Sequence, residues 1–144
     1  MNSPIITWYI YDNSHYIQEE DYYLGSFNSD SEITIVIQVW NNRYGAIDVE
    51  NIENARFVFY FDSLEDSKLL EYCTVAVNNE ETFITPEIEL NRAIVNIGDL
   101  SGEKNDGLET VANQGNYKNV IIKFNVNSKM RNGLKNLYLD IEID

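Results

Sequence analysis

The side chains that can do chemistry in this sequence are mainly carboxylates. Three groups have a spacing suited to acid–base work: Asp48 with Glu50, Asp62 with Glu65 and Asp66, and Glu87 with Glu89. A glycoside hydrolase needs two carboxylates across a cleft, about 5–9 Å apart. Here most acids fall in turns or on the outer faces of predicted strands, and with 24 acids chance pairs are frequent. We therefore assign no catalytic residue.

Histidine and cysteine each occur once. His15 lies in the turn-like segment DNSHY, so Ser-His-Asp chemistry would depend on this one imidazole. Cys73 aligns with Val75 and Val77, which is typical of a small buried hydrophobic residue. No disulfide or cysteine-based zinc site can form within one chain. An intracellular hydrolase is a further alternative, and it would require His15 or a carboxylate pair in a cleft as its catalytic group.

Oxygen-rich loops are the places where a metal would be expected. Asp62, Glu65 and Asp66 are candidate Ca²⁺ ligands, and a second group runs from Asp99 to Asn105 and Asp106. Neither matches the twelve-residue EF-hand pattern. The alternative is that these are solvated turn residues, and we predict no cofactor.

Aromatic residues gather in the first third of the chain. They are Trp8, Tyr9, Tyr11, Tyr16, Tyr22, Tyr23, Trp40 and Tyr44. Aromatic rings stack on sugars and anchor protein interfaces, whereas core packing accounts for Trp40 and Trp8. We assign an interaction role to Tyr22, Tyr23, Tyr44 and Tyr138.

The charge balance excludes some partners. The net charge of −14 disfavours nucleic acid phosphates and anionic membrane surfaces. No apolar run reaches the roughly 18 residues that a membrane helix needs. The N-terminal segment MNSPIITWYIYD lacks the basic region of a signal peptide. We expect synthesis in a host cytoplasm without export by a signal peptide.

The run EITIVIQVW at residues 32–40 is the strongest strand signal and is predicted to be central. Ile33, Ile35, Ile37 and Val39 share one face of the pleat, and the other face is mixed rather than polar. Further strands are predicted at 5–11, 55–62, 70–77, 82–85, 86–90, 92–97, 117–127 and 134–144. Segment 98–115 is predicted to be one exposed, mobile loop.

No segment of helical length shows a 3.6-residue period, and the 144 residues suit one domain. Eight or nine short strands without intervening helices predict an all-β fold in which two antiparallel sheets form a sandwich, immunoglobulin-like or jelly-roll.

Two resemblances add expectations about function. Residues 41–63, NNRYGAIDVENIENARFVFYFDS, are similar to a segment of type-3 carbohydrate-binding modules and cohesin-like sandwiches. The whole chain, an acidic sandwich rich in Asn, Ile and Tyr that begins at Met1, resembles in type the immunoglobulin-like accessory proteins of tailed bacteriophages. This second resemblance implies a non-enzymatic virion component of the capsid, neck, tail or baseplate. The alternative is a carbohydrate-binding sandwich.

The partners expected from these resemblances are other protein subunits, in a homo- or hetero-oligomer, with a glycan as the further candidate. Contact would run through aromatic-rich strands and through the segments 41–53 and 98–115. Neither nucleic acid nor membrane is expected.

Overall fold

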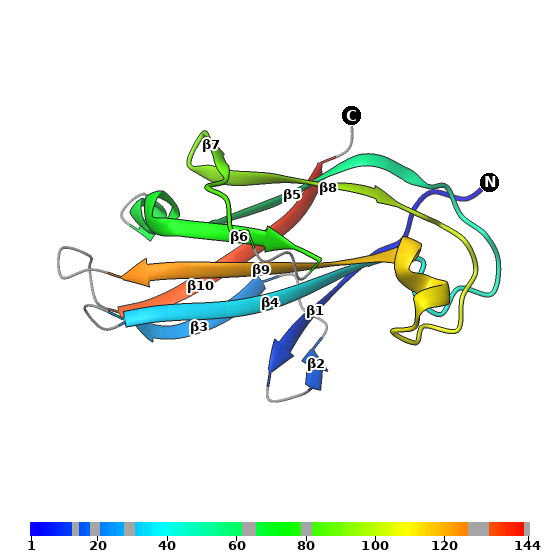
Figure 1. Ribbon diagram of the computed structural model, residues 1–144, viewed down its shortest axis with the longest axis horizontal. Helices are drawn as coiled ribbons and strands as arrows, with labels where there is room; N and C mark the ends of the chain where they lie inside the picture. Colours follow the sequence, from blue (N-terminus) through cyan, green and yellow to red (C-terminus); the bar gives the residue numbers. More distant parts are fainter. Residues whose placement is uncertain are drawn as a thin grey trace.

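The computed structural model describes residues 1–12, 15–17, 21–27, 31–61, 66–78, 82–126 and 133–142. Within these residues two five-stranded sheets pack face to face (Figure 1). All strand pairs in both sheets are antiparallel. The prediction of an all-β, two-sheet antiparallel sandwich is confirmed.

The strands of the first sheet are, in spatial order, β2 (His15–Ile17), β1 (Ile6–Asp12), β4 (Ser31–Asn41), β9 (Tyr117–Val126) and β6 (Cys73–Val77). Those of the second sheet are β3 (Asp21–Phe27), β10 (Gly133–Glu142), β5 (Ile52–Phe61), β8 (Arg92–Leu100) and β7 (Glu87–Glu89). From β4 onward the chain crosses between the sheets repeatedly. The sheets are thus tied by the connections at both ends of the sandwich.

Strand β4 is central in the first sheet, as predicted, because β1 and β9 flank it. Its inward residues Ile35, Ile37 and Val39 are buried, and so are Gln38 and Trp40 on the opposite face. Successive side chains of a strand point to opposite faces of the sheet, so both are buried only where both faces are covered. The second face of β4 is mixed rather than polar in sequence because it is covered in the fold.

Aromatic contacts join the two sheets across the core. Trp8 of β1 meets Phe57 of β5 edge to face, with ring centroids 5.6 Å apart. Phe124 of β9 contacts Phe59 and Phe61 of β5 at 6.3 and 5.7 Å. Such pairs contribute beyond the area they bury.

Two predicted strands differ in the structure. Residues 70–77 are not one strand, because a 3₁₀ helix, η1 (Asp66–Tyr72), precedes β6. Leu69 and Leu70 are both buried, and a strand would turn one of two adjacent side chains away from the core. Residues 82–85 contribute only an isolated bridge between Ile84 and Val75.

No strand is predicted at residues 21–27, where β3 lies. Gly25, which favours a turn in the sequence, pairs with Lys135 beside an irregularity in the β3–β10 ladder. Glycine within a strand often marks such a bulge. The strands predicted at 86–90 and 92–97 pair as a hairpin, β7 with β8, and Leu90 and Asn91 between them are both in the left-handed region at φ 53° and 61°.

Truncation of Phe124 tests the packing between the sheets. Phe124→Ala is expected to lower the free energy of unfolding by about 3–5 kcal/mol, because the fully buried ring contacts two rings of the other sheet. Urea unfolding measures this. Leu90→Ala, at a side chain that is 81% exposed, should change stability by less than about 0.5 kcal/mol. Equal effects of the two substitutions would contradict the described core.

The buried thiol of Cys73 makes stability depend on alkaline pH. Burial raises its pKa from 9.0 to about 12. Between these values the unfolded thiol has lost its proton and the folded one has kept it, so the contribution to stability is full below pH 9.0 and is lost as pH rises toward 12. When the pH is raised from about 8 to about 10.5, the midpoint of unfolding should fall by more in the wild type than in Cys73→Ala. An equal fall in both proteins would show that the thiol is accessible.

Candidate functional site

The predicted interaction residues lie in different parts of the molecule. Tyr44 is exposed in the loop after β4. Tyr138 lies on the outer face of the second sheet, stacked on Tyr60 with centroids 5.5 Å apart. Tyr22 and Tyr23 pair through their backbones with β10, and their side chains lie outside the described part of the structure. The four residues therefore do not form one site that the structure describes.

The candidate metal ligands are not gathered either. Asp62 and Glu65 fall outside the described residues, and of Asp66 only the backbone is described, at the start of η1. Among the side chains that the structure describes, no three His, Cys, Asp or Glu residues are grouped to hold a metal ion. Asn105 and Asp106 instead accept hydrogen bonds from the backbone N–H groups of Gly107 and Leu108.

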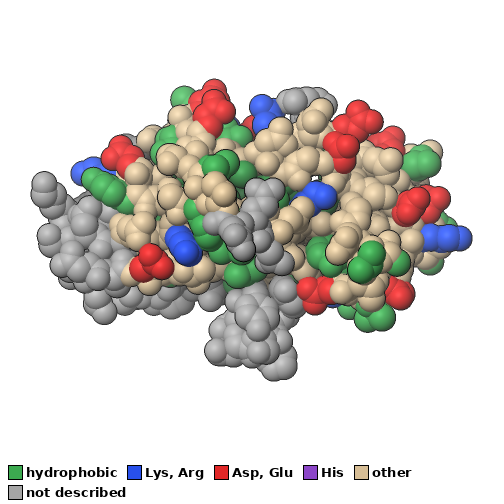
Figure 2. Space-filling view, viewed as in Figure 1, with side chains coloured by type: hydrophobic (Ala, Val, Ile, Leu, Met, Phe, Trp, Pro, Cys, Tyr) green, Lys and Arg blue, Asp and Glu red, His purple; other side chains and the backbone are tan. Residues whose placement is uncertain are grey.

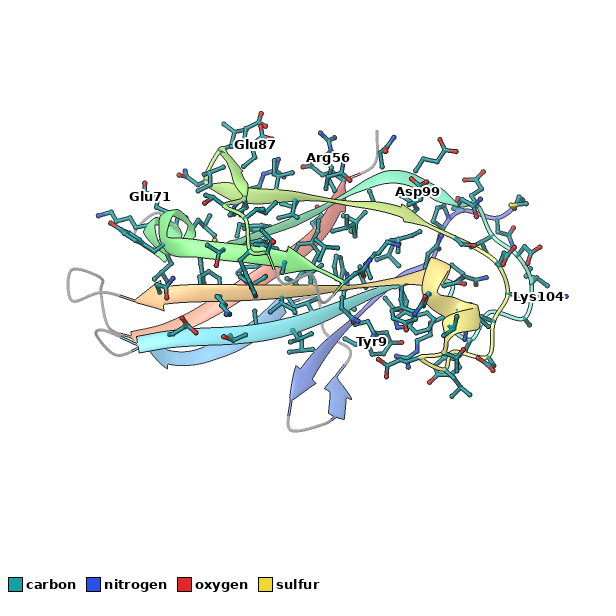
Figure 3. All side chains as sticks on the ribbon, in the orientation of Figure 1. Tyr9, Arg56, Glu71, Glu87, Asp99 and Lys104 are labelled. Atoms are coloured by element: carbon teal, nitrogen blue, oxygen red, sulfur yellow. The ribbon has the colours of Figure 1, made fainter. Side chains whose placement is uncertain are left out.

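Two long loops meet at one end of the sandwich. The first loop, residues 42–51, joins β4 to β5, and the second loop, residues 101–116, joins β8 to β9 and ends in a 3₁₀ helix, η2 (Val111–Asn116). Figure 1 shows both at the end opposite the β7–β8 turn, and Figure 3 shows Lys104 at its tip. We call this end, made of both loops, the loop end.

Asparagine side chains hold the two loops together. We call Asn41, Asn42, Asn105, Asn113 and Asn116 the asparagine network. The amide of Asn42 donates to the carbonyls of Ile47 at 2.8 Å and Gly102 at 2.9 Å, the latter 60 residues further along the chain. The amide of Asn105 donates to the carbonyl of Asn42 at 2.8 Å.

Asn113 and Asn116 donate to acceptors within the second loop itself. Asn116 donates to the carbonyls of Ser101 and Glu103, both at 2.9 Å. Asn113 donates to Asp106 Oδ1 at 2.6 Å, and this bond is the main cause that lowers the pKa of Asp106. The second loop is thus braced by hydrogen bonds. Most of its residues are exposed, as predicted, but residues 98–100 of the predicted loop belong to β8.

Glycines allow the loops to approach closely. A Cβ atom at Gly102 would collide with the carbonyl of Val49, and one at Gly107 would collide with the ring of Tyr44. Gly107 also has φ +76°, a conformation that glycine adopts without strain. Tyr44 therefore lies directly over the second loop.

Arg43 fastens the loop end to the outer face of the first sheet. Its guanidinium carbon lies 4.3 Å from the ring centroid of Tyr9, 4.6 Å from that of Trp40 and 5.0 Å from that of Tyr44. Its Nε donates to the carbonyl of Gly107 at 2.9 Å. Tyr9, labelled in Figure 3, reaches this cluster from β1. Cation–π contacts of this kind are worth about 0.5–2 kcal/mol each.

Beside Arg43, on the same outer face of the first sheet, lies a hydrogen-bonded cluster centred on Gln38. The indole Nε1 of Trp40 donates to Gln38 Oε1 at 2.6 Å. Gln38 Nε2 donates to Glu109 Oε1 at 2.7 Å and to Asn119 Oδ1 at 2.9 Å. Tyr117 stacks on Trp40 with centroids 4.5 Å apart, and burial followed by the charge of Glu109 raises its pKa above the usual value.

Sequence reasoning missed Gln38, Arg43 and Tyr117. The only signal for Gln38 is an amide within a run of β-branched residues, which predicts a covered second face. Arg43 follows a strand end, and Tyr117 begins one, so neither stands out without knowledge of which residues meet in space.

The loop end leaves large apolar side chains exposed. The exposed fractions are 62% for Tyr44, 61% for Ile47, 55% for Leu108 and 82% for Val111. Figure 2 shows hydrophobic side chains interspersed with acidic ones at this end. A fixed backbone that presents apolar side chains to solvent is suited to binding.

Comparisons with known proteins give little. No protein-family model matches the sequence, and no curated protein matches it. A similar solved structure is that of AvmM, which catalyses macrocyclization in alchivemycin A biosynthesis. The alignment covers 94% of this chain and 79% of that chain, with 9% identity and a TM-score of 0.43. Within the described residues, no helix is long and apolar enough to cross a membrane.

The comparison with AvmM corrects two predictions. The similar structure belongs to a biosynthetic catalyst and not to a capsid, neck, tail or baseplate protein. The virion role is therefore withdrawn, and so is the statement that the chain is not an enzyme. A likeness at this level transfers neither an activity nor a site, so no reaction takes their place.

Replacing Asn42 by aspartate tests the asparagine network. The carboxylate cannot donate to the carbonyls of Ile47 and Gly102, so Asn42→Asp should lower the free energy of unfolding by about 1–3 kcal/mol in urea. Asn51→Asp is the matched control, because Asn51 Oδ1 accepts from the Gly102 N–H and a carboxylate can do the same. Equal destabilisation by both substitutions would mean that added charge, not a lost donor, is responsible.

Proposed function

We propose that the chain is a recognition domain whose loop end binds another protein. One observation supports this most: two loops 60 residues apart are locked together by buried asparagines, yet they leave Tyr44, Ile47, Leu108 and Val111 exposed. Preorganised loops lose little conformational entropy on binding. Exposed apolar side chains on them provide the area that becomes buried.

Charge defines the kind of partner. Exposed acids surround the apolar side chains of the loop end: Asp48, Glu103, Asp106 and Glu109. A second copy of the chain would carry the same charge of −14, which opposes self-association. The proposed partner is therefore a different protein with an apolar centre and a rim of Lys and Arg.

Selection from a random-peptide display library tests this charge and apolar complementarity directly. Peptides selected on the wild-type protein should combine apolar and basic residues, and their affinity should fall as salt is raised. Ile47→Ser and Leu108→Ser should each weaken binding by about tenfold, because each removes an apolar contact.

Leu90→Ser is the matched control for these substitutions. Leu90 is a similarly exposed apolar residue, but it lies in the β7–β8 turn at the other end of the molecule (Figure 1). Its replacement should leave binding unchanged. Selected peptides that bind the serine variants of the loop end as well as wild type would overturn the proposal.

A further inference from the structure

A polar depression lies beside the loop end on the outer face of the first sheet. Its volume is about 390 Å³, and it is lined by Asn78, Gln114, Tyr117, Lys118 and Asn119. Ligand sites in proteins begin at about 300 Å³. The lining residues come from the turn after β6, from η2 and from the start of β9.

The walls of the depression are fixed by hydrogen bonds. Asn78, in the left-handed region at φ 56°, donates its N–H to the carbonyl of Asn119 at 2.8 Å. Asn78 Oδ1 accepts from the N–H of Asn119 at 3.3 Å. Gln38 donates to Asn119 Oδ1, which fixes the orientation of the Asn119 amide. The site thus needs little rearrangement to bind.

Tyr117 provides an aromatic surface in this depression. One side of its ring packs on Trp40, which is fully buried, so the remaining exposed part of the ring faces the depression. The phenol is protonated at neutral pH, because its usual pKa of 10.0 is well above 7, and burial followed by the charge of Glu109 raises that pKa further. Tyr117 therefore offers both an apolar surface and a neutral hydroxyl.

The polar lining favours an uncharged ligand rich in oxygen. The three amide side chains each carry donors and an acceptor, a combination that suits hydroxyl groups, which both donate and accept. Lys118 is the one charged residue among the described residues of the lining, and the carboxylate of Glu109 is bonded to Gln38 in the adjoining cluster. Four of these five lining residues are uncharged, which favours a neutral ligand.

We propose that the depression binds an uncharged polyhydroxylated molecule of the class of a single sugar ring. The C–H face of the ring lies against Tyr117, and the amides of Asn78, Gln114 and Asn119 bind its hydroxyl groups. This site is separate from the exposed apolar side chains proposed to bind a protein.

Titration of ¹⁵N-labelled protein followed by NMR tests the site. Glucose, galactose and mannose are the neutral probes, and galacturonic acid and glucosamine are the charged ones. A neutral sugar should shift the backbone signals of Asn78 and residues 117–119 and the side-chain amide signals of Asn78, Gln114 and Asn119. Shifts with trisaccharides as well as free sugars would assign the ligand to the end of a glycan; shifts with free sugars alone would assign it to a small metabolite.

Gln114→Ala is the decisive variant. Gln114 is exposed, so its loss should not affect folding, and it should weaken sugar binding about three- to tenfold by removing one hydrogen-bonding group. Asn125→Ala is the control, because Asn125 is exposed on the same face of β9 at the far end of the strand. Ile47→Ser should leave sugar binding unchanged, which separates this site from the protein-binding surface.

Two results would overturn the inference. The first is the absence of shifts at these residues with every neutral sugar. The second is stronger binding of galacturonic acid or glucosamine than of the neutral sugars, with an affinity that falls as salt is raised.

Discussion

The backbone carbonyl groups of two irregular loops must find hydrogen-bond donors inside the protein, and this constraint shapes one end of the molecule. In a sheet the neighbouring strand supplies the donors, whereas residues 42–51 and 101–116 make only scattered backbone bonds, such as that from the Val49 N–H to the Gly102 carbonyl. The asparagine network supplies further donors. A buried carbonyl without a donor costs about 1–3 kcal/mol, so each amide fixes the position of the segment that it serves.

This bracing explains the arrangement of the rest of the loop end. With the carbonyls satisfied from within, the side chains of Tyr44, Ile47, Leu108 and Val111 are free to face solvent. Arg43 joins the loops to the aromatic residues of the first sheet, and Gln38 joins the second loop to Trp40 and Asn119. The outer face of that sheet is therefore covered at the loop end and carries a depression beside Tyr117.

Much of the fold follows from period-2 patterns, which identified β4, β5, β9 and β10 and the sandwich they form. The pattern failed where a local signal competed with a distant partner. Gly25 favours a turn but pairs with β10, and residues 70–72 read as the start of a strand but lie on a 3₁₀ helix.

The site was less accessible to prediction. In sequence an asparagine-rich segment reads as a solvated loop, because asparagine favours turns. Only the fold shows that Asn42 and Asn116 lie next to carbonyls of distant segments. Tyr44 and Tyr138 were both predicted as contact residues. Tyr44 is exposed, whereas Tyr138 packs on Tyr60 of the neighbouring strand in the second sheet.

Backbone hydrogen exchange tests the central claim, that the loop end is a braced part of the fold. The amides of Val49, Ser101 and Gly102 donate to Gly102 O, Gly115 O and Asn51 Oδ1 at 2.7–2.8 Å. We expect these amides to exchange as slowly as those of β4 and β9, because they open only when the sandwich opens. Complete exchange in the first minutes, with the strands still protected, would contradict the account.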